Sequence, residues 1–352
     1  MKDSIRNPNP TDPLTFKFRW MHQGNVAADA ALAGSFDGRQ LTLDDQTWPL
    51  KQVGPCFCDQ PVLSSSVYEE KDEQWYPVVI SVTGQQAETL KRVIDAARSK
   101  QALDEEQKQL IEQGQGDSFR SELCPHCDAS ISLSKFADSP QGYCNYCQTL
   151  FTFGDGQRPF GTDPETLDRE LEPKYRLCDH CEMYSRPTKF RIFYFVFLVY
   201  HMHFSSDTTV RCPGCMRWEA WKMLCGNLFG LLGLPLAFTQ LVRSYRSRIE
   251  KGPLRGLDDA NRLANRGKID RALDRYDRLM DNLPINAGIK FNIGSGLLKK
   301  EDPRHAESMF LLALEDCANY EPALYGLAEC YRRLGKTKEL AGIEFQLSRD
   351  HD

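Results

Sequence analysis

The chain has 352 residues, of which 41% are hydrophobic and 26% charged, and its formal net charge is -5 at pH 7. These values are typical of a folded protein with room for two or three domains, and they exclude disorder throughout the chain. The negative balance argues against a global attraction to nucleic acid. Residues 1–13, which we predict to be a disordered tail, lack the apolar core of a secretory signal.

Residues 14–112 are expected to form several strands followed by one helix. The β-rich segments LTFKFRWM and WYPVVISV lie on either side of a stretch with a turn signal at Asp37 and Gly38. Apolar residues then recur at helical spacing at Ala87, Leu90, Ile94 and Ala97. Strands followed by an amphipathic helix resemble a pleckstrin-homology-like (PH-like) β-barrel.

Eight of the thirteen cysteines fall into four C-x-x-C pairs, which favours metal thiolates in a reducing cytosol over disulfides. Cys56 and Cys58 stand outside these pairs. A strand would point both of their thiols to one face, so they are either extra ligands or, as the stronger hypothesis, packed thiols. Their role stays open.

The first zinc ribbon is predicted over residues 124–155, after a polar linker at 113–123. Cys124 and Cys127 are separated by sixteen residues from Cys144 and Cys147, a spacing typical of zinc ribbons. Four thiolates complete a tetrahedral zinc shell. His126 is therefore expected to be a surface residue, not a ligand.

The second zinc ribbon is predicted over residues 174–217, where thirty residues separate Cys178 and Cys181 from Cys212 and Cys215. An extended hairpin can fill this long spacing. With four thiolates on each ion no coordination position stays open for water, so both zinc ions are expected to be structural. The sequence has no P-loop, G-x-S-x-G, H-E-x-x-H or dinucleotide motif, and we expect neither enzymatic activity nor a small-molecule substrate.

Between these two pairs lies FRIFYFVFLVYHMHF, residues 190–204, with Arg191 as its one charge. As a helix it would be about 22 Å long, short of the roughly 30 Å hydrocarbon core of a bilayer. A single crossing would also separate the two cysteine pairs. Its Phe, Tyr, Val and Ile content favours a strand, and Ser205 to Asp207 offers a turn before the chain pairs back.

An apolar helical segment is predicted over 218–245, with twenty uncharged residues at 223–242. That length is typical of a spanning helix. Basic residues flank both ends, and glycines and Pro235 interrupt the run, so an in-plane or re-entrant insertion is favoured over a full crossing or a buried helix. We expect membrane lipid contact at 190–204 and 218–243.

Cysteine pairs flanking an apolar segment resemble the LITAF-type domain, in which zinc gathers the pairs and the apolar part sits in the cytosolic leaflet. The resemblance implies that Cys178, Cys181, Cys212 and Cys215 are zinc ligands. The chain departs from that pattern at Val210, where the family usually carries a histidine, and in its strand-like apolar run.

Residues 253–352 contain an internal repeat of 34 residues. The offset relates Leu263, Leu297 and Tyr331; Ala260, Gly294 and Ala328; Ala272 and Ala306; and Tyr276 and Phe310. This period, with small residues where helices cross, resembles the tetratricopeptide repeat (TPR). The third unit departs from the pattern because Leu340 and Glu344 replace an alanine and an aromatic residue, which leaves its last helix in doubt.

The fold class predicted is multidomain α+β: a β-rich PH-like domain, two zinc ribbons, an apolar helix able to insert into a membrane, and a TPR-like solenoid. The function predicted is a cytoplasmic, membrane-associated scaffold that binds a protein or peptide in the inner groove of its repeats. Four residues are candidates for that groove: Asn292, Tyr325, Glu329 and Arg332.

Two alternatives remain open. The first is a nucleic-acid-binding ribbon protein, although residues 118–152 carry no basic stripe and we expect no nucleic-acid partner. The second is a thiol-redox protein, which would need an exposed pair of thiols with low pKa.

Overall fold

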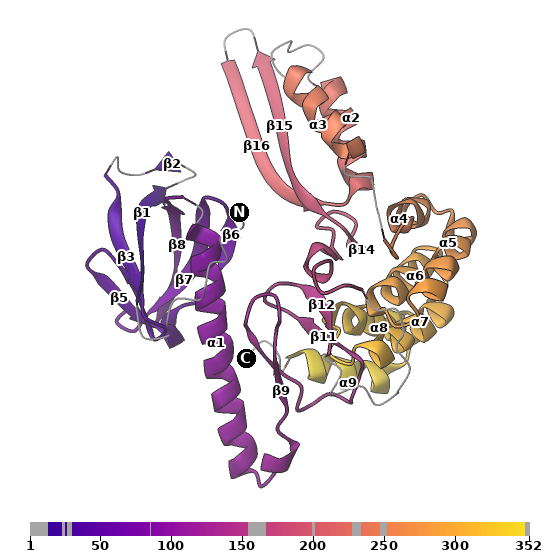
Figure 1. Ribbon diagram of the computed structural model, residues 1–352, viewed down its shortest axis with the longest axis horizontal. Helices are drawn as coiled ribbons and strands as arrows, with labels where there is room; N and C mark the ends of the chain where they lie inside the picture. The colour runs from indigo at the N-terminus through magenta and orange to yellow at the C-terminus, as the bar shows by residue number, and fades with distance from the viewer. Residues whose placement is uncertain are drawn as a thin grey trace. The chain divides into compact units, whose positions relative to one another are not determined.

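The computed structural model describes residues 13–22, 25–26, 30–84, 86–153, 167–198, 201–226, 234–246 and 252–348. The chain divides into two compact units, Met1–Lys135 and Phe136–Asp352 (Figure 1). Each unit has a hydrophobic core of its own. The tail expected at the N-terminus lies outside the described residues, apart from Pro13.

Within the described residues, an antiparallel sheet of eight strands forms most of the N-terminal unit. Its strands are β1 (Leu14–His22), β2 (Asn25–Val26), β3 (Leu32–Phe36), β4 (Gln40–Leu43), β5 (Gln46–Pro49), β6 (Phe57–Asp59), β7 (Val62–Glu69) and β8 (Gln74–Val82). β1 pairs with β3 on one side and with β8 on the other, so two meanders meet along it. Phe16 and Phe18 of β1 are buried while Lys17 between them is exposed, as the alternation of a strand requires.

Helix α1 (Gln86–Glu112) follows the sheet directly. Ala87, Leu90 and Ile94 are buried in the same core as Phe16 and Phe18, and Ala97 packs against it. The predicted order of strands followed by an amphipathic helix is confirmed. The likeness to a PH domain stays a resemblance.

Short hairpins carry three of the four cysteine pairs. They are formed by β9 (Ser121–Leu123) with β10 (Ser130–Ser132), β11 (Gln141–Cys144) with β12 (Thr149–Thr152), and β13 (Arg176–Leu177) with β14 (Tyr184–Ser185). Each C-x-x-C therefore lies at or near the tip of a hairpin, where both thiols can turn to one side.

A long hairpin contains the apolar run 190–204. β15 (Thr188–Leu198) pairs with β16 (His201–Arg211), in a register that runs from Thr188 opposite Arg211 to Leu198 opposite His201. The strand prediction for this run is confirmed for the backbone; from residue 193 to 207 the side chains lie outside the described part. The turn predicted at Ser205 to Asp207 is wrong, because these residues belong to β16 and pair with β15.

Two helices follow the hairpin, α2 (Pro213–Gly226) and α3 (Leu234–Arg246), where one apolar segment was predicted. They pack on each other, and α2 also contacts β15. Phe190, Met216, Met223 and Leu241 contribute to a small core between them. In the described part of the chain, none of the helices has the length and apolar character needed to cross a membrane. Residues 227–233 of the predicted segment lie outside the described residues.

The 34-residue period corresponds to successive helix pairs. The helices are α4 (Leu257–Asn265), α5 (Ile269–Asn282), α6 (Ala287–Lys299), α7 (Pro303–Asp316), α8 (Glu321–Leu334) and α9 (Thr337–Ser348). Small residues lie at the helix crossings as predicted: a Cβ added at Gly294 would come within 2.8 Å of the Phe310 ring. The helix left in doubt, α9, does form, and Glu344 in it is exposed.

Candidate metal centres

Two groups of four cysteines could hold a metal ion. The first group comprises Cys124, Cys127, Cys144 and Cys147, and the second Cys178, Cys181, Cys212 and Cys215. Within each group the thiol sulfur atoms all lie within 4.8 Å of one another. A tetrahedral shell with metal–sulfur bonds of about 2.3 Å would place its sulfurs about 3.8 Å apart. The Sγ atoms of Cys181 and Cys212 are 3.9 Å apart, which fits that geometry.

The first three C-x-x-C pairs share one backbone conformation. The residue after each pair has a positive φ: 60° at Asp128, 59° at Gln148 and 58° at Glu182. Each of these residues donates its N–H to the carbonyl oxygen of the first cysteine of its pair, over 2.7–3.0 Å. This turn brings the two thiols of a pair to the same side of the chain. His126, which the sequence analysis set aside as a ligand, is not a member of the first group.

Replacing Gln148 with glycine is expected to stabilise the first ribbon. A left-handed conformation costs a residue with a Cβ about 1–2 kcal/mol, and the extra backbone entropy of unfolded glycine offsets about 0.5–1 kcal/mol of the relief. The side chain of Gln148 is exposed, so little else changes. We expect the free energy of unfolding, measured by denaturant titration of the zinc-loaded chain, to rise by about 0.5–1 kcal/mol. Gln148→Ala keeps the Cβ and should give no gain; an equal gain from both variants would contradict the strain argument.

The fourth pair differs because Cys212 directly precedes α2, and the N–H of Met216 donates to the carbonyl of Cys212 as in a helix. Backbone N–H groups also point at sulfur: Cys212 N lies 3.2 Å from Cys178 Sγ, and Cys215 N lies 3.4 Å from Cys212 Sγ. Such donors stabilise thiolates. The group is thus arranged for anionic sulfur.

Because the four thiols of the second group lie close together, their pKa values shift in opposite directions. Hydrogen bonds from Cys181 and Cys212 lower the pKa of Cys178, whereas the neighbouring Cys178 and Cys181 raise the pKa of Cys215. Four thiols so close together cannot all ionise unless a cation neutralises them. A divalent metal ion with a preference for sulfur would remove this conflict.

The long hairpin explains how thirty intervening residues can separate the two halves of one site. Because β15 and β16 pair along their full length, Thr188 and Arg211 lie opposite each other at the end near the cysteines. Asp179 then exchanges hydrogen bonds with Val210: its N–H donates to the Val210 carbonyl, and its carboxylate accepts from the Val210 N–H at 2.7 Å. These bonds hold the two pairs side by side.

A buried ion pair attaches the second site to the first helix of the repeats. Arg217 of α2 lies 2.6 Å from Asp258 of α4, and both side chains are more than nine-tenths buried. Asp258 also accepts from the N–H of Gly214, inside the fourth C-x-x-C pair, at 2.9 Å. Sequence reasoning missed this contact because nothing in the local pattern at residue 258 points 44 positions back along the chain.

Five other cysteines, Cys56, Cys58, Cys225, Cys317 and Cys330, belong to neither group. Burial raises the pKa of Cys56 to about 11 and that of Cys330 to about 12, so both thiols stay protonated at neutral pH. For Cys56 this agrees with the hypothesis of a packed thiol.

The four residues predicted to line the partner groove lie in two different environments. Asn292 on α6 is fully buried and its amide binds the backbone of Tyr184. On α8, Tyr325 is 49% exposed. Glu329 lies near it in sequence and is paired with Arg332 and Arg333. Contact with a partner stays a prediction for all four, but the polar groups of Asn292 face the protein's own chain.

Two tyrosines near the cysteine pairs are held by asparagine side chains of the helical region. Asn292 accepts from the N–H of Tyr184 at 2.7 Å and donates to its carbonyl at 2.7 Å. Asn319 does the same for Tyr143, at 2.9 and 2.8 Å. Both tyrosines and the helices belong to one hydrophobic core. The ribbon segments and the repeats of this unit therefore form one packed body.

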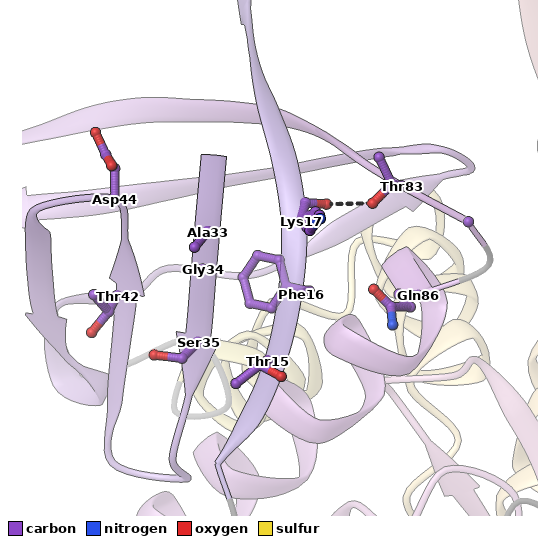
Figure 2. A pocket seen from close by; sticks show the side chains of 11 residues that line it. Thr15, Phe16, Lys17, Ala33, Gly34, Ser35, Thr42, Asp44, Thr83 and Gln86 are labelled. Carbon is purple, nitrogen blue, oxygen red and sulfur yellow. Dashed lines mark hydrogen bonds between the residues drawn. The ribbon is translucent and has the colours of Figure 1, made fainter. Parts of the chain in front are cut away.

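The N-terminal unit has a surface depression with a volume of about 900 Å³. Figure 2 shows the ring of Phe16 beside the strand that carries Gly34, with the side chains of Ser35 and Thr42 nearby. Asp44 is the single carboxylate of the lining, which has neither cysteine nor histidine. The depression therefore supplies no further set of metal ligands.

Comparison of the chain with protein-family models, with curated proteins and with solved structures found no match. The TPR and LITAF resemblances therefore rest on the residues of this chain alone.

Proposed function

We propose that this chain is a non-enzymatic zinc-binding scaffold that binds a protein partner through its helical repeats and touches the cytosolic face of a membrane. The observation that carries the proposal is the pair of four-cysteine groups. Structural metal sites stabilise short segments that carry no catalytic group.

Zinc fits these groups better than other metals for chemical reasons. Four thiolates in a tetrahedral arrangement are the usual shell of structural zinc, whereas calcium and magnesium prefer oxygen. The strands of the hairpins around the cysteines are only two to four residues long, and their buried side chains, such as Leu150, pack into the core shared with the helices. Zinc would fix the cysteine ends of these hairpins. The metal content of the purified chain tests this part of the proposal.

Partner binding is supported by exposed apolar and charged side chains on the repeats. Tyr325 and Phe345 are large and exposed, and Arg332 lies within 3.7 Å of Glu344 between α8 and α9. Exposed aromatic residues and arginine are the residue types enriched in protein interfaces. We propose this end of the array as a surface for a protein or peptide.

Membrane contact is supported by the exposed face of α2. Trp218 is 61% exposed and Trp221 is 45% exposed, and residues three apart lie on one side of a helix. Lys222 lies over the Trp218 ring, with its ammonium 5.5 Å from the ring centre. Tryptophan beside lysine is typical of helices that lie in the interface of an anionic membrane. We propose in-plane binding through this face.

The double variant Trp218→Ala/Trp221→Ala is expected to lose vesicle binding. A large apolar side chain contributes about 1.5–3 kcal/mol when it leaves water completely, so two tryptophans that are about half exposed contribute about that much together. Co-sedimentation of the zinc-loaded chain with phosphatidylcholine vesicles that contain phosphatidylserine should therefore show at least about tenfold weaker binding. Trp75→Ala, which removes a similarly exposed tryptophan from the N-terminal unit, should bind like the parent chain. Unchanged binding by the double variant would contradict membrane contact through α2.

A further inference from the structure

The surface that holds Tyr184 has the properties of a peptide-binding site. Besides the N–H of Tyr184, which donates to Asn292, two side-chain amides donate to the carbonyl of Tyr184: that of Asn292 at 2.7 Å and that of Asn261 of α4 at 2.8 Å. The side-chain amide of Asn292 thus binds both the N–H and the carbonyl of a single extended residue, as a neighbouring β-strand would. We name Asn261, Gly288 and Asn292 the tyrosine-binding surface.

The asparagines of this surface are fixed before any ligand arrives. Asn261 accepts from the hydroxyl of Tyr276 at 2.6 Å and from the amide of Asn292 at 2.9 Å. All three side chains are buried. These bonds fix the orientation of both amides. The oxygen of Asn292 is then free to accept from a backbone N–H, and the amide nitrogens of Asn261 and Asn292 donate to a backbone carbonyl. Preorganised groups of this kind lower the cost of ordering on binding.

The same surface selects an aromatic side chain. A Cβ added at Gly288 would lie 2.4 Å from the ring of Tyr184, so the absent side chain of this glycine is what admits the ring against α6. The ring is buried completely, which raises the pKa of its hydroxyl, and the side chain of Asn286 also interacts with that hydroxyl. A segment that binds here must be extended and must carry tyrosine or a similar ring.

The occupant of this surface is attached to the second metal site. Tyr184 follows Cys181 by three residues and pairs with Leu177, which immediately precedes Cys178. The N–H of Cys178 donates to the carbonyl of Met183. Strands β13 and β14 are only two residues long, so a metal bound to Cys178 and Cys181 would help the burial of Met183 and Tyr184 to keep this segment in its hairpin.

We propose that the tyrosine-binding surface is a site for an extended partner segment with a tyrosine, and that Tyr184 fills it while the second ribbon holds its metal. Loss of that metal frees residues 182–188 from their hairpin and opens the surface. The proposal rests on the partner binding proposed above and names its ligand class. A segment attached to the same chain acts at an effective concentration on the order of 1 mM. A partner segment present at micromolar concentration is therefore outcompeted as long as residues 182–188 stay in their hairpin.

The probe is a fluorescein-labelled peptide with the sequence of residues 182–188, and the readout is fluorescence anisotropy with the full chain. The zinc-loaded chain should bind it at least a hundredfold more weakly than Cys212→Ser/Cys215→Ser, in which the second site is disabled. Tyr184→Ala should bind the peptide more tightly than the parent chain even with both metals present, because without the ring that packs on Gly288 the chain's own segment is held there only by its backbone bonds. Adding Asn292→Ala to either variant should abolish binding, and a peptide with alanine for tyrosine should not bind.

Each outcome bears on a separate part of the proposal. Equal binding by the zinc-loaded parent and the cysteine variant would overturn metal control, and absence of binding by both opened variants, with helical circular dichroism retained, would overturn the site. If the cysteine variant fails to fold, Tyr184→Ala decides whether the site exists, and partial removal of metal from the parent with a chelator decides whether metal controls it. Metal analysis of the same samples separates these failures: a parent chain with no metal would sink the zinc proposal and metal control of the surface, and Tyr184→Ala would still decide whether the site exists.

Discussion

Replacing Cys212 with serine is expected to lower the zinc content of the purified chain from two ions to one. The Sγ of Cys212 lies 3.9 Å from that of Cys181 and accepts the N–H of Cys215, so its loss removes one ligand and disturbs another. Binding of structural zinc contributes about 10–16 kcal/mol in small zinc domains at neutral pH. We therefore expect the second ribbon to lose its fold, including the contact between Tyr184 and Asn292. Elemental analysis and the melting curve measure the two effects.

Two matched variants make this result specific. Cys225→Ser replaces an exposed cysteine of α2 that belongs to neither group, and it should keep two zinc ions. Cys124→Ser should also lose one ion, but from the first site, and should leave the second ribbon folded. A parent chain that contains one zinc ion or none would defeat the two-site interpretation.

Truncating Phe310 to alanine is expected to cost about 3–5 kcal/mol of stability. Its ring is fully buried and fills the space left by two glycines: Cβ atoms added at Gly294 and Gly326 would lie 2.8 and 2.5 Å from it. It also packs against Phe291. Because α6, α7 and α8 all meet at this ring, the resulting cavity would loosen two helix pairs together. Denaturant titration followed by circular dichroism measures the loss.

The neighbour Leu311 provides the control, since it is 41% exposed on the same helix. Leu311→Ala removes an apolar side chain without a cavity and should change the free energy of unfolding by about 0.5 kcal/mol or less. Similar losses for both variants would show that residue 310 is not at the centre of the repeat packing.

Features encoded by short-range spacing could be predicted from the sequence. The C-x-x-C pairs pointed to eight cysteines because two thiols three residues apart can turn to one side, and the structure brings those same eight into two groups that could hold a metal ion. The 34-residue period gave the helix pairs and the small residues at their crossings, and the structure shows that Phe310 fills the space beside one of them, Gly294.

The local sequence pattern did not predict the structure where the same residues are compatible with two conformations. Ser205 to Asp207 are turn-forming residues, yet they pair with β15 because a hairpin of eleven-residue strands lines up the cysteine pairs at its base. In the same way, the run at 223–242 has the composition of one long helix, but the helices found in the described residues end at Gly226 and begin again at Leu234.

The sequence by itself determined which cysteines are candidate metal ligands, the strand character of the apolar run and the repeat, since each depends on residues close together along the chain. Only the tertiary structure decided what Asn292 does: its amide meets the backbone of Tyr184, 108 residues away. The same holds for Asp258 and Gly214, 44 residues apart. An asparagine or aspartate on a helix has the same local pattern whether it faces solvent or another segment. Its partner is fixed only when the chain folds, because a buried polar group must find a hydrogen bond wherever the packing places one.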